Sequence, residues 1–292
     1  MKGTYNIVIG GKSYECENVI TEAGRIAMLR AISGQKAGWA ESIVAGVGET
    51  AASDSDTDLV FSVTGGDINA TIIDPINEKL YFKTSLPLQD EVTIYELGCY
   101  ASNTLTTQSS ESGGGSLILI LSGNTAWTDV DGSHTLDTTN ARVDGESISY
   151  TIAASDAATG YASFVSDLSF VPDAGRFKLA YYCDEISTLT VRFKVDDSNY
   201  FESSAWSVAA GYNVDSVLKS AFTATGAPSW TGIQTLEFEI AATATGGQIS
   251  LDALRYELPV SEESNLLSRV VLPEPQIKLP GVPVDVEYVL EI

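Results

Sequence analysis

Residues 189–195 read LTVRFKV, and apolar and polar side chains alternate along the whole stretch. Leu189 and Phe193 fall on one face of an extended chain, whereas Arg192 and Lys194 fall on the other. A repeat of two residues is typical of a β-strand that buries one face and leaves the other in water. The stretch therefore predicts an antiparallel sheet that packs against its domain on one side only.

The same alternation recurs through residues 117–256. It is clear in residues 147–152 (SISYTI) and 236–240 (LEFEI), where Ser, Thr or Glu separates the apolar and aromatic residues. Turns rich in Gly, Ser and Asp join these stretches, and no helical repeat separates them. Such a pattern indicates a β-sandwich or jelly roll. We expect an inserted jelly-roll domain that occupies residues 103–262 together with Ser/Thr/Gly-rich and Pro/Ser/Glu-rich linkers.

One substantial helix is predicted near residues 21–33. Thr21 is a suitable N-cap residue, and Ile26, Leu29 and Ile32 recur at helical spacing. The rest of the first hundred residues reads as strands and turns. The fold class predicted for the whole chain is therefore all-β.

The last thirty residues contain two further strand patterns, at 266–272 and 284–292. Two strands alone are marginally stable, so they need a sheet to join. The N-terminal segment breaks off at about residue 102 and needs strands to complete its own sheet. We therefore predict a small split β-domain formed by residues 1–102 and 263–292, with the jelly roll inserted between its two parts.

Composition excludes several classes of function. The 292 residues hold 39 acidic and 16 basic side chains, a formal charge of −23, which would repel a phosphate backbone. We expect no nucleic-acid partner. We interpret the negative charge as a means of keeping the protein soluble when it is displayed at high local density. The alternative is that the acidic residues form scattered divalent-cation sites. The longest aliphatic run, at 117–121, is far shorter than a membrane span, so no membrane insertion is expected.

No pattern of catalytic residues stands out. A Ser-His-Asp or Cys-His arrangement must use His134, the single histidine, which lies in a turn-like context. Paired carboxylates of a glycosidase cannot be singled out among 39 acids. The Gly46-Val47-Gly48 sequence lacks the third glycine of a dinucleotide loop. We expect a protein that is not an enzyme, with a hydrolase as the least favoured alternative.

Three stretches of the outer segments resemble a pattern in structural proteins of bacteriophage virions, of the tail-fibre, collar and head-fibre type. Residues 45–59 are similar to the form G-x-G-x-x-x-A-x-x-x-D-T-x-L, and residues 94–100 (IYELGCY) to E-I-G-L-F. Residues 267–271 (LSRVV), with the later Lys278 and the last strand, are similar to F-A-R … K. In that family the second and third stretches lie close in sequence, whereas about 160 residues separate them here.

The resemblance covers roughly residues 1–102 and 263–292. It implies a virion structural component, made in the host bacterial cytoplasm, that assembles as a homotrimer and contacts other virion proteins. The resemblance does not distinguish a capsid decoration protein from a neck or collar protein or a tail-fibre protein. No catalytic residue is implied.

The insert resembles jelly-roll carbohydrate-binding, galactose-binding-like modules, chiefly through residues 249–257 (ISLDALRYE), which are similar to a closing strand with an I-x-L-D motif. This implies an alternative function, a glycan-binding module that aids attachment to a host surface. The candidate sugar contacts are Tyr200, Phe201, Trp206 and Tyr212, with core packing as the alternative for each. Adjacent strand residues face opposite ways, so one of Tyr200 and Phe201 should point outward.

The same resemblance suggests one metal site. Jelly-roll modules often hold a structural calcium where their first and last strands meet, bound by carboxylate and main-chain oxygens. Asp129 or Asp131 near the opening strand and Asp252 in the closing strand could supply such ligands. The alternative is that each is a solvated turn aspartate, and no other cofactor is expected.

Overall fold

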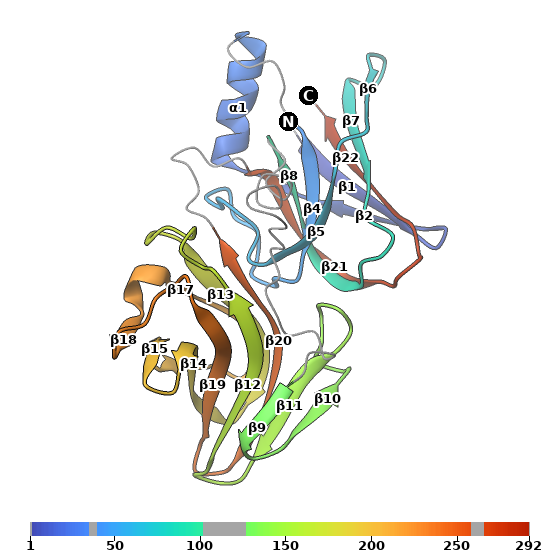
Figure 1. Ribbon diagram of the computed structural model, residues 1–292. Coiled ribbons are helices and arrows are strands. Elements are labelled where there is room, and N and C mark those ends of the chain that lie inside the picture. The colour runs from blue at the N-terminus through green and yellow to red at the C-terminus, as the bar shows by residue number, and fades with distance from the viewer. Residues whose placement is uncertain (1, 35–39, 102–126, 258–265, 292) are drawn as a thin grey trace. The chain divides into compact units, whose positions relative to one another are not determined.

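The computed structural model describes residues 2–34, 40–101, 127–257 and 266–291. The chain divides into two compact units, Met1–Ser116 with Val260–Ile292, and Leu117–Pro259, so the first unit is built from both ends of the sequence (Figure 1). We call them the split unit and the insert. The predicted linkers at 103–115 and 259–264 and the apolar run at 117–121 lie outside the described residues.

The split unit contains two antiparallel sheets of five strands each. The first has the order β2(Lys12–Glu17), β1(Lys2–Ile9), β22(Val284–Glu291), β7(Lys79–Ser85), β6(Ala70–Asp74). The second has the order β3(Val19–Ile20), β21(Leu266–Lys278), β8(Val92–Tyr100), β4(Ser42–Gly46), β5(Ser62–Asp67). The two C-terminal strands, β21 and β22, each lie between strands of the N-terminal segment, and so complete both sheets.

Alternation of apolar and polar residues along the strands explains how the two sheets of the split unit pack. In β22 the apolar residues at every second position, from Val284 to Leu290, are buried, and Asp285 and Glu291 are exposed. Tyr5 of β1 lies opposite Tyr288, with ring centroids 4.9 Å apart. The Tyr5 hydroxyl is 2.8 Å from the Ser268 Oγ of β21, so a buried hydrogen bond joins the two sheets.

The predicted helix is confirmed as α1(Glu22–Ile32), and it is the one α-helix among the described residues. The Thr21 side chain accepts a hydrogen bond from the Gly24 amide at 2.9 Å, as an N-cap residue does. Gly24 is buried against the Leu267 carbonyl of β21. The helix is thus held by its first turn, and its later turns extend away from β21 (Figure 1). No helix in the described ranges is long and apolar enough to cross a membrane.

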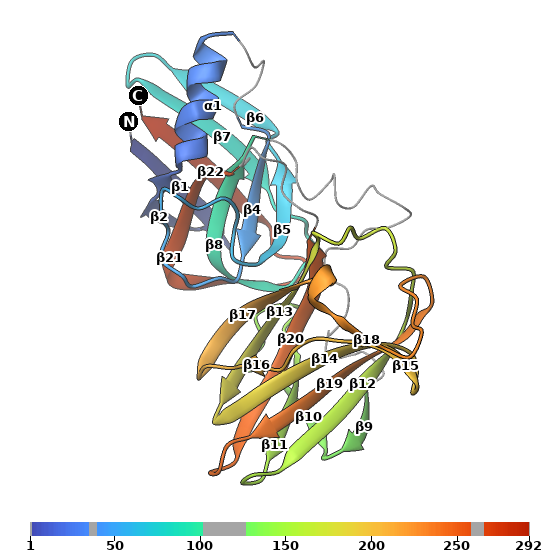
Figure 2. The same cartoon turned by 90° about the vertical axis from the view of Figure 1, so that its left-hand side faces the viewer.

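The insert contains two antiparallel sheets, which confirms the predicted sandwich (Figure 2). The five-stranded sheet has the order β10(His134–Asp137), β11(Ser147–Ile152), β20(Gly247–Glu257), β13(Arg176–Asp184), β17(Gly211–Leu218). The seven-stranded sheet has the order β18(Thr223–Thr225), β15(Asn199–Glu202), β14(Ile186–Asp196), β19(Ile233–Ala242), β12(Ala157–Ser166), β9(Trp127–Asp131), and β16(Trp206–Ser207) also pairs with β14. A 3₁₀ turn, Lys219–Ala221, follows β17.

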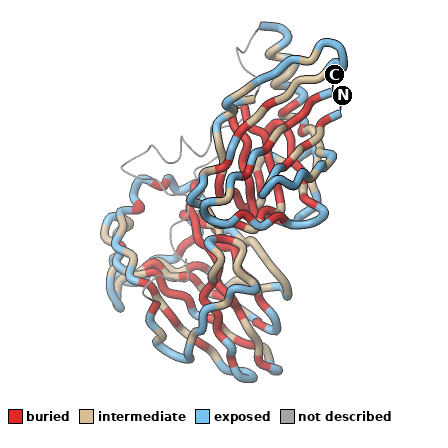
Figure 3. The backbone as a smooth tube through the Cα atoms, turned by 90° about the vertical axis from the view of Figure 1, so that its right-hand side faces the viewer, coloured by how far each residue is buried: buried red, intermediate tan, exposed pale blue. Residues whose placement is uncertain are grey.

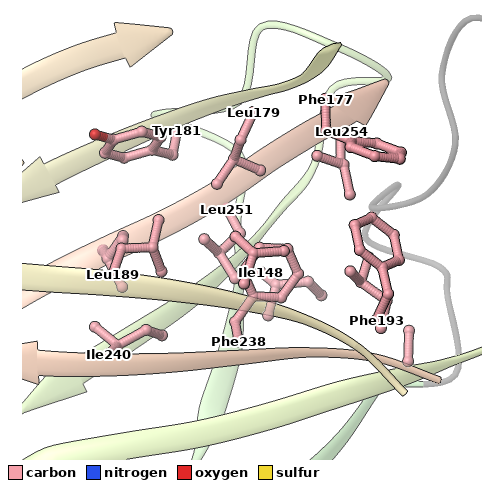
Figure 4. Packing of buried hydrophobic residues seen from close by; sticks show 14 of the residues in the cluster. Ile148, Phe177, Leu179, Tyr181, Leu189, Phe193, Phe238, Ile240, Leu251 and Leu254 are labelled. Carbon is pink, nitrogen blue, oxygen red and sulfur yellow. The ribbon is translucent and has the colours of Figure 1, made fainter. Parts of the chain in front are cut away.

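The core of the insert is formed by the inward faces of its two sheets (Figure 4). Phe177 and Phe193, from opposite sheets, have ring centroids 4.6 Å apart, and Trp230 packs beside both. Figure 3 shows buried residues inside each unit and exposed residues at the turns. Because the apolar residues of each strand point inward, the polar residues of the same strands form the outer faces of the sheets.

Candidate functional site

The structure places the four predicted sugar contacts in three environments. Tyr200 lies on the outer face of the seven-stranded sheet, whereas Phe201 points inward and stacks on Trp230 with centroids 3.9 Å apart. This confirms that one of the adjacent pair points outward. Trp206 also packs against the core, and Tyr212 belongs to the other sheet. The four residues therefore do not form one site.

Tyr212 belongs to a cluster around a buried carboxylate. Asp252 accepts hydrogen bonds from the main-chain amides of Arg142 and Val143, at 3.0 and 3.3 Å, and from the Tyr212 hydroxyl. The Arg142 guanidinium lies 3.6 Å from the centroid of the Tyr212 ring. Burial raises the pKa of Asp252 to about 7, although these hydrogen bonds act in the opposite direction. The cluster holds the loop between β10 and β11 on the five-stranded sheet.

The three predicted calcium ligands are not brought together. Asp129 accepts hydrogen bonds from the Tyr150 hydroxyl, which is on the core side of the five-stranded sheet, whereas Asp252 is on the outer side of the same sheet. Asp131 is the last residue of β9 and accepts a hydrogen bond from the Gly132 amide. In the part of the chain that the structure describes, no three His, Cys, Asp or Glu side chains are grouped so as to hold a metal ion. Each carboxylate instead has donors of its own.

His134 lies beside Asp129, with its Nδ1 2.9 Å from a carboxylate oxygen, and both side chains are partly exposed. Burial alone would raise the pKa of Asp129, but hydrogen bonds from Tyr150 and His134 lower it below its usual value. The Trp127 indole donates to the Tyr150 hydroxyl at 2.6 Å. These hydrogen bonds, which run from Trp127 through Tyr150 and Asp129 to His134, join the edge strand β9 to the five-stranded sheet.

The outer face of the seven-stranded sheet carries a different arrangement. Strand pairing places Glu202, Arg192, Glu237 and Tyr161 side by side in one row across β15, β14, β19 and β12. The next row along the strands contains Tyr200 and Lys194, and the row on the other side contains Glu239. We call this set the charged face: Tyr161, Arg192, Lys194, Tyr200, Glu202, Glu237 and Glu239.

Ion pairs fix the polar groups of the charged face. Arg192 donates to Glu202, to Glu237 at 3.0 Å and to Glu239 at 2.5 Å. Lys194 donates to the second oxygen of Glu237 at 2.9 Å. Partial burial alone would lower the pKa of Arg192, but its three carboxylate partners raise it above the usual value. Each long side chain is thereby restrained to one geometry.

Two tyrosines flank these ion pairs. Tyr161 is the strand neighbour of Glu237, and Tyr200 is that of Lys194, with its ring centroid 5.8 Å from the Arg192 guanidinium. Both rings are partly exposed. Three strand spacings and two residues along the strands separate their main-chain positions, which amounts to ~16 Å. The charged face is thus a row of polar groups between two aromatic side chains.

Most of the charged face was not predicted as a site. The alternation of residues 189–195 and 236–240 indicates that Arg192, Lys194, Glu237 and Glu239 face water. Tyr161 had no such signal, because residues 157–166 mix small and apolar residues on both faces. Strand pairing, which brings Tyr161 next to Glu237, was needed to identify it.

In the split unit, by contrast with the charged face of the insert, the main polar cluster is largely buried. Glu96 of β8 accepts hydrogen bonds from the amides of Gly48 and Phe61, both at 3.0 Å, and from Arg269 Nε at 2.9 Å. Arg269 also pairs with Asp56 at 2.7 Å. The three stretches quoted for the phage resemblance therefore meet at one hydrogen-bonded centre. Glu96 and Arg269 are buried, whereas Asp56 is partly exposed, and together the three side chains hold the loop between β4 and β5.

A groove of about 420 Å³ lies on the outer face of the first sheet of the split unit. The Lys83–Glu287 ion pair, with an N···O distance of 2.6 Å, lies in it beside Asn6 and Asp285. Its lining contains polar and aliphatic residues and no aromatic side chain. It therefore lacks the stacking surface that the charged face offers.

Comparison with known proteins gives structural matches. No protein-family model matches the chain, and neither does any curated protein. The family 30 carbohydrate-binding module of a cellulosomal cellulase of Clostridium thermocellum is 9% identical, with a TM-score of 0.39 over 50% of this chain and 98% of that one. The family 11 module of another cellulase of that organism is 12% identical, with a TM-score of 0.36 over 53% and 94%.

Glycoside hydrolase structures also match. The glycoside hydrolase domain of Endo-D from Streptococcus pneumoniae is 12% identical, with a TM-score of 0.34 over 47% of this chain and 22% of that one. The chain thus spans about a quarter of the glycoside hydrolase structures it matches and nearly the whole of the two binding modules. At this identity and these TM-scores, the matches identify no ligand.

Proposed function

We propose that the protein is a glycan-binding protein and that the charged face of the insert is its binding surface. One observation carries the proposal: Tyr161 and Tyr200 lie on the same outer face, with a network of ion-paired side chains between them. We therefore favour glycan binding over a purely structural role for the insert.

The chemistry of a sugar suits this surface. The apolar face of a pyranose ring stacks on an aromatic side chain, and its hydroxyl groups need donors and acceptors in fixed positions. Arg192 and Glu237 are held in place by their ion pairs before any ligand arrives. A polar group that is already ordered loses little conformational entropy on binding.

A glycan array probed with the full chain tests this function. We expect saturable binding to at least one oligosaccharide class, and loss of that binding in Tyr161→Ala and Tyr200→Ala. Tyr182→Ala is the matched control, because Tyr182 is a partly exposed tyrosine on the outer face of the five-stranded sheet. An array without signal, or equal losses in all three variants, would contradict the proposal.

A second proposal concerns the split unit, and the exposed apolar side of α1 favours it. We propose that this unit attaches the chain, as a homotrimer, to a bacteriophage virion. Ile26, Leu29 and Ile32 are 45, 67 and 78% exposed, and a row of this kind is typical of a surface that binds another protein. Mass spectrometry of purified particles should detect the protein, and its copy number would distinguish capsid decoration from neck or tail. Its absence from particles would refute this proposal.

A further inference from the structure

The charges on the charged face of the insert do not cancel. Arg192 and Lys194 are its two cations, and Lys194 also pairs at 2.8 Å with Asp197, in the turn after β14. Together the two cations have four carboxylate partners: Glu202, Glu237, Glu239 and Asp197. Two positive charges against four negative ones leave a net charge of −2 on this surface.

Water reaches the carboxylates of this surface more than it reaches the cations. The side chains of Arg192 and Lys194 are 21 and 16% exposed, and Glu237 between them is buried. The side chains of Glu239 and Asp197 are 47 and 96% exposed. A ligand that approaches the charged face therefore meets carboxylates before it meets either cation.

The exposed carboxylates also keep acceptor capacity. Glu202 and Glu239 each pair with Arg192 through one oxygen, and among the described residues the other oxygen of each accepts no hydrogen bond. Arg192 directs its Nε and both terminal nitrogens at carboxylates. A carboxylate or sulfate on a ligand would have to compete with the acids that already hold Arg192 and Lys194, whereas a ligand cation finds acceptors that are available.

The two tyrosines of the charged face set the length of the ligand. The ~16 Å between the main-chain positions of Tyr161 and Tyr200 exceeds the size of one pyranose ring, so a ligand that stacks on both is an oligosaccharide. Strand register places Glu239 on one side of the line between the two rings and Asp197 on the other. Such a ligand would therefore pass between exposed carboxylates.

We infer that the glycan bound by the charged face is an oligosaccharide that carries protonated amino groups. The inference rests on the glycan-binding function proposed above and names its substrate class. An ammonium group on the sugar donates charge-assisted hydrogen bonds to the available oxygens of Glu202 and Glu239, and such bonds are roughly twice as strong as neutral ones. A uronic acid or a sulfated sugar would instead bring like charges together, which disfavours binding.

Titration calorimetry of the full chain with two ligands of the same length tests the inference. The first is a chitosan oligosaccharide, at a pH where its amines are protonated, and the second is the fully N-acetylated chitin oligosaccharide, which is neutral. We expect the chitosan form to bind at least ~tenfold more tightly, because hydrogen bonds to charged groups contribute more than neutral ones. Added salt should reduce this difference.

Two double variants of equal charge separate the charged face from the charge of the whole chain. Glu202→Gln/Glu239→Gln keeps the size of both side chains and removes two negative charges, so it should bind the two oligosaccharides about equally. Glu15→Gln/Glu146→Gln removes two charges elsewhere, at an exposed position of β2 and a partly exposed position before β11. This control should keep the preference of the wild type for chitosan.

Three results would overturn the inference. They are equal affinity of the wild type for the two oligosaccharides, tighter binding of an acidic oligosaccharide than of chitosan, and equal losses of chitosan binding in the two double variants. If the wild type shows no preference but binds a neutral oligosaccharide that Tyr161→Ala no longer binds, the inference fails and the glycan-binding function stands. A chain that binds no glycan refutes both, so the two failures can be told apart.

Discussion

The Nε of Arg269 donates a hydrogen bond of 2.9 Å to Glu96, and both side chains are almost inaccessible, at 1 and 0% exposure. The two residues are 173 positions apart, on either side of the insert. Since Glu96 also accepts amide hydrogen bonds from the β4–β5 loop, this pair joins three separate segments of the split unit.

Replacement of Arg269 by methionine should destabilise the split unit strongly. It leaves the carboxylate of Glu96 buried without its cation, and loss of one partner of a buried ion pair costs about 3–5 kcal/mol of unfolding free energy. Hydrogen exchange in urea, followed in peptides of the split unit, measures the change. The double variant Arg269→Met/Glu96→Leu should recover part of the loss, because no uncompensated charge remains. If the single variant is as stable as the wild type, the pair does not have this role.

Gly24→Ala should destabilise the protein, although alanine is the better helix former by ~1 kcal/mol. A Cβ at this position would lie 2.1 Å from the Leu267 carbonyl oxygen, so the helix would have to move away from β21. Thermal unfolding by circular dichroism measures the effect. Ala27→Gly serves as the control for propensity and should cost ~1 kcal/mol. A stabilised Gly24→Ala variant would show that close packing at this point does not matter.

The pKa of Asp252 gives a pH dependence with a definite sign. Because burial raises this pKa from 3.8 to about 7, the folded insert holds a proton that the unfolded chain releases above pH 4. Its contribution is fully present below pH 4 and is lost as the pH rises to about 7.

Asp252→Asn removes this titration. The unfolding free energy of the wild type relative to the variant should fall between pH 4 and 7 and stay constant above pH 8. Urea unfolding monitored by tryptophan fluorescence measures it, since Trp127, Trp206 and Trp230 lie in the insert. A difference that does not change with pH would mean that Asp252 is ionised throughout this range.

Arg192→Lys should weaken glycan binding at least ~tenfold while the insert stays folded. Lysine keeps the positive charge, but its single ammonium cannot hold Glu202, Glu237 and Glu239 in the geometry that a guanidinium does. Titration calorimetry with the best oligosaccharide from the array measures the affinity. Arg176→Lys, an exposed arginine of the five-stranded sheet, is the matched control. Unchanged affinity in Arg192→Lys would argue against the charged face as the binding surface.

Local patterns predicted much of the fold. The alternation in residues 189–195 placed Phe193 in the core and Arg192 outside, and the Thr21 cap located the start of α1. The opposite directions of Tyr200 and Phe201 followed from the pleat of a strand. All of these depend on neighbouring residues, for which backbone geometry leaves few choices.

The candidate site depended on contacts that are distant in sequence. Arg192 and Glu237 are 45 residues apart and meet because β14 pairs with β19 in one register. No local pattern specifies that register, or shows that Asp129 and Asp252 lie on opposite sides of a sheet.

The sequence by itself determined which face is buried in the strands that alternate cleanly, such as residues 189–195 and 236–240, since a two-residue repeat follows from the period of the extended backbone. Only the tertiary structure decided which solvent-facing residues of different strands become neighbours, because strand order and register result from packing of the whole core. It is this packing that places Tyr161 beside Glu237 and leaves the apolar side of α1 exposed.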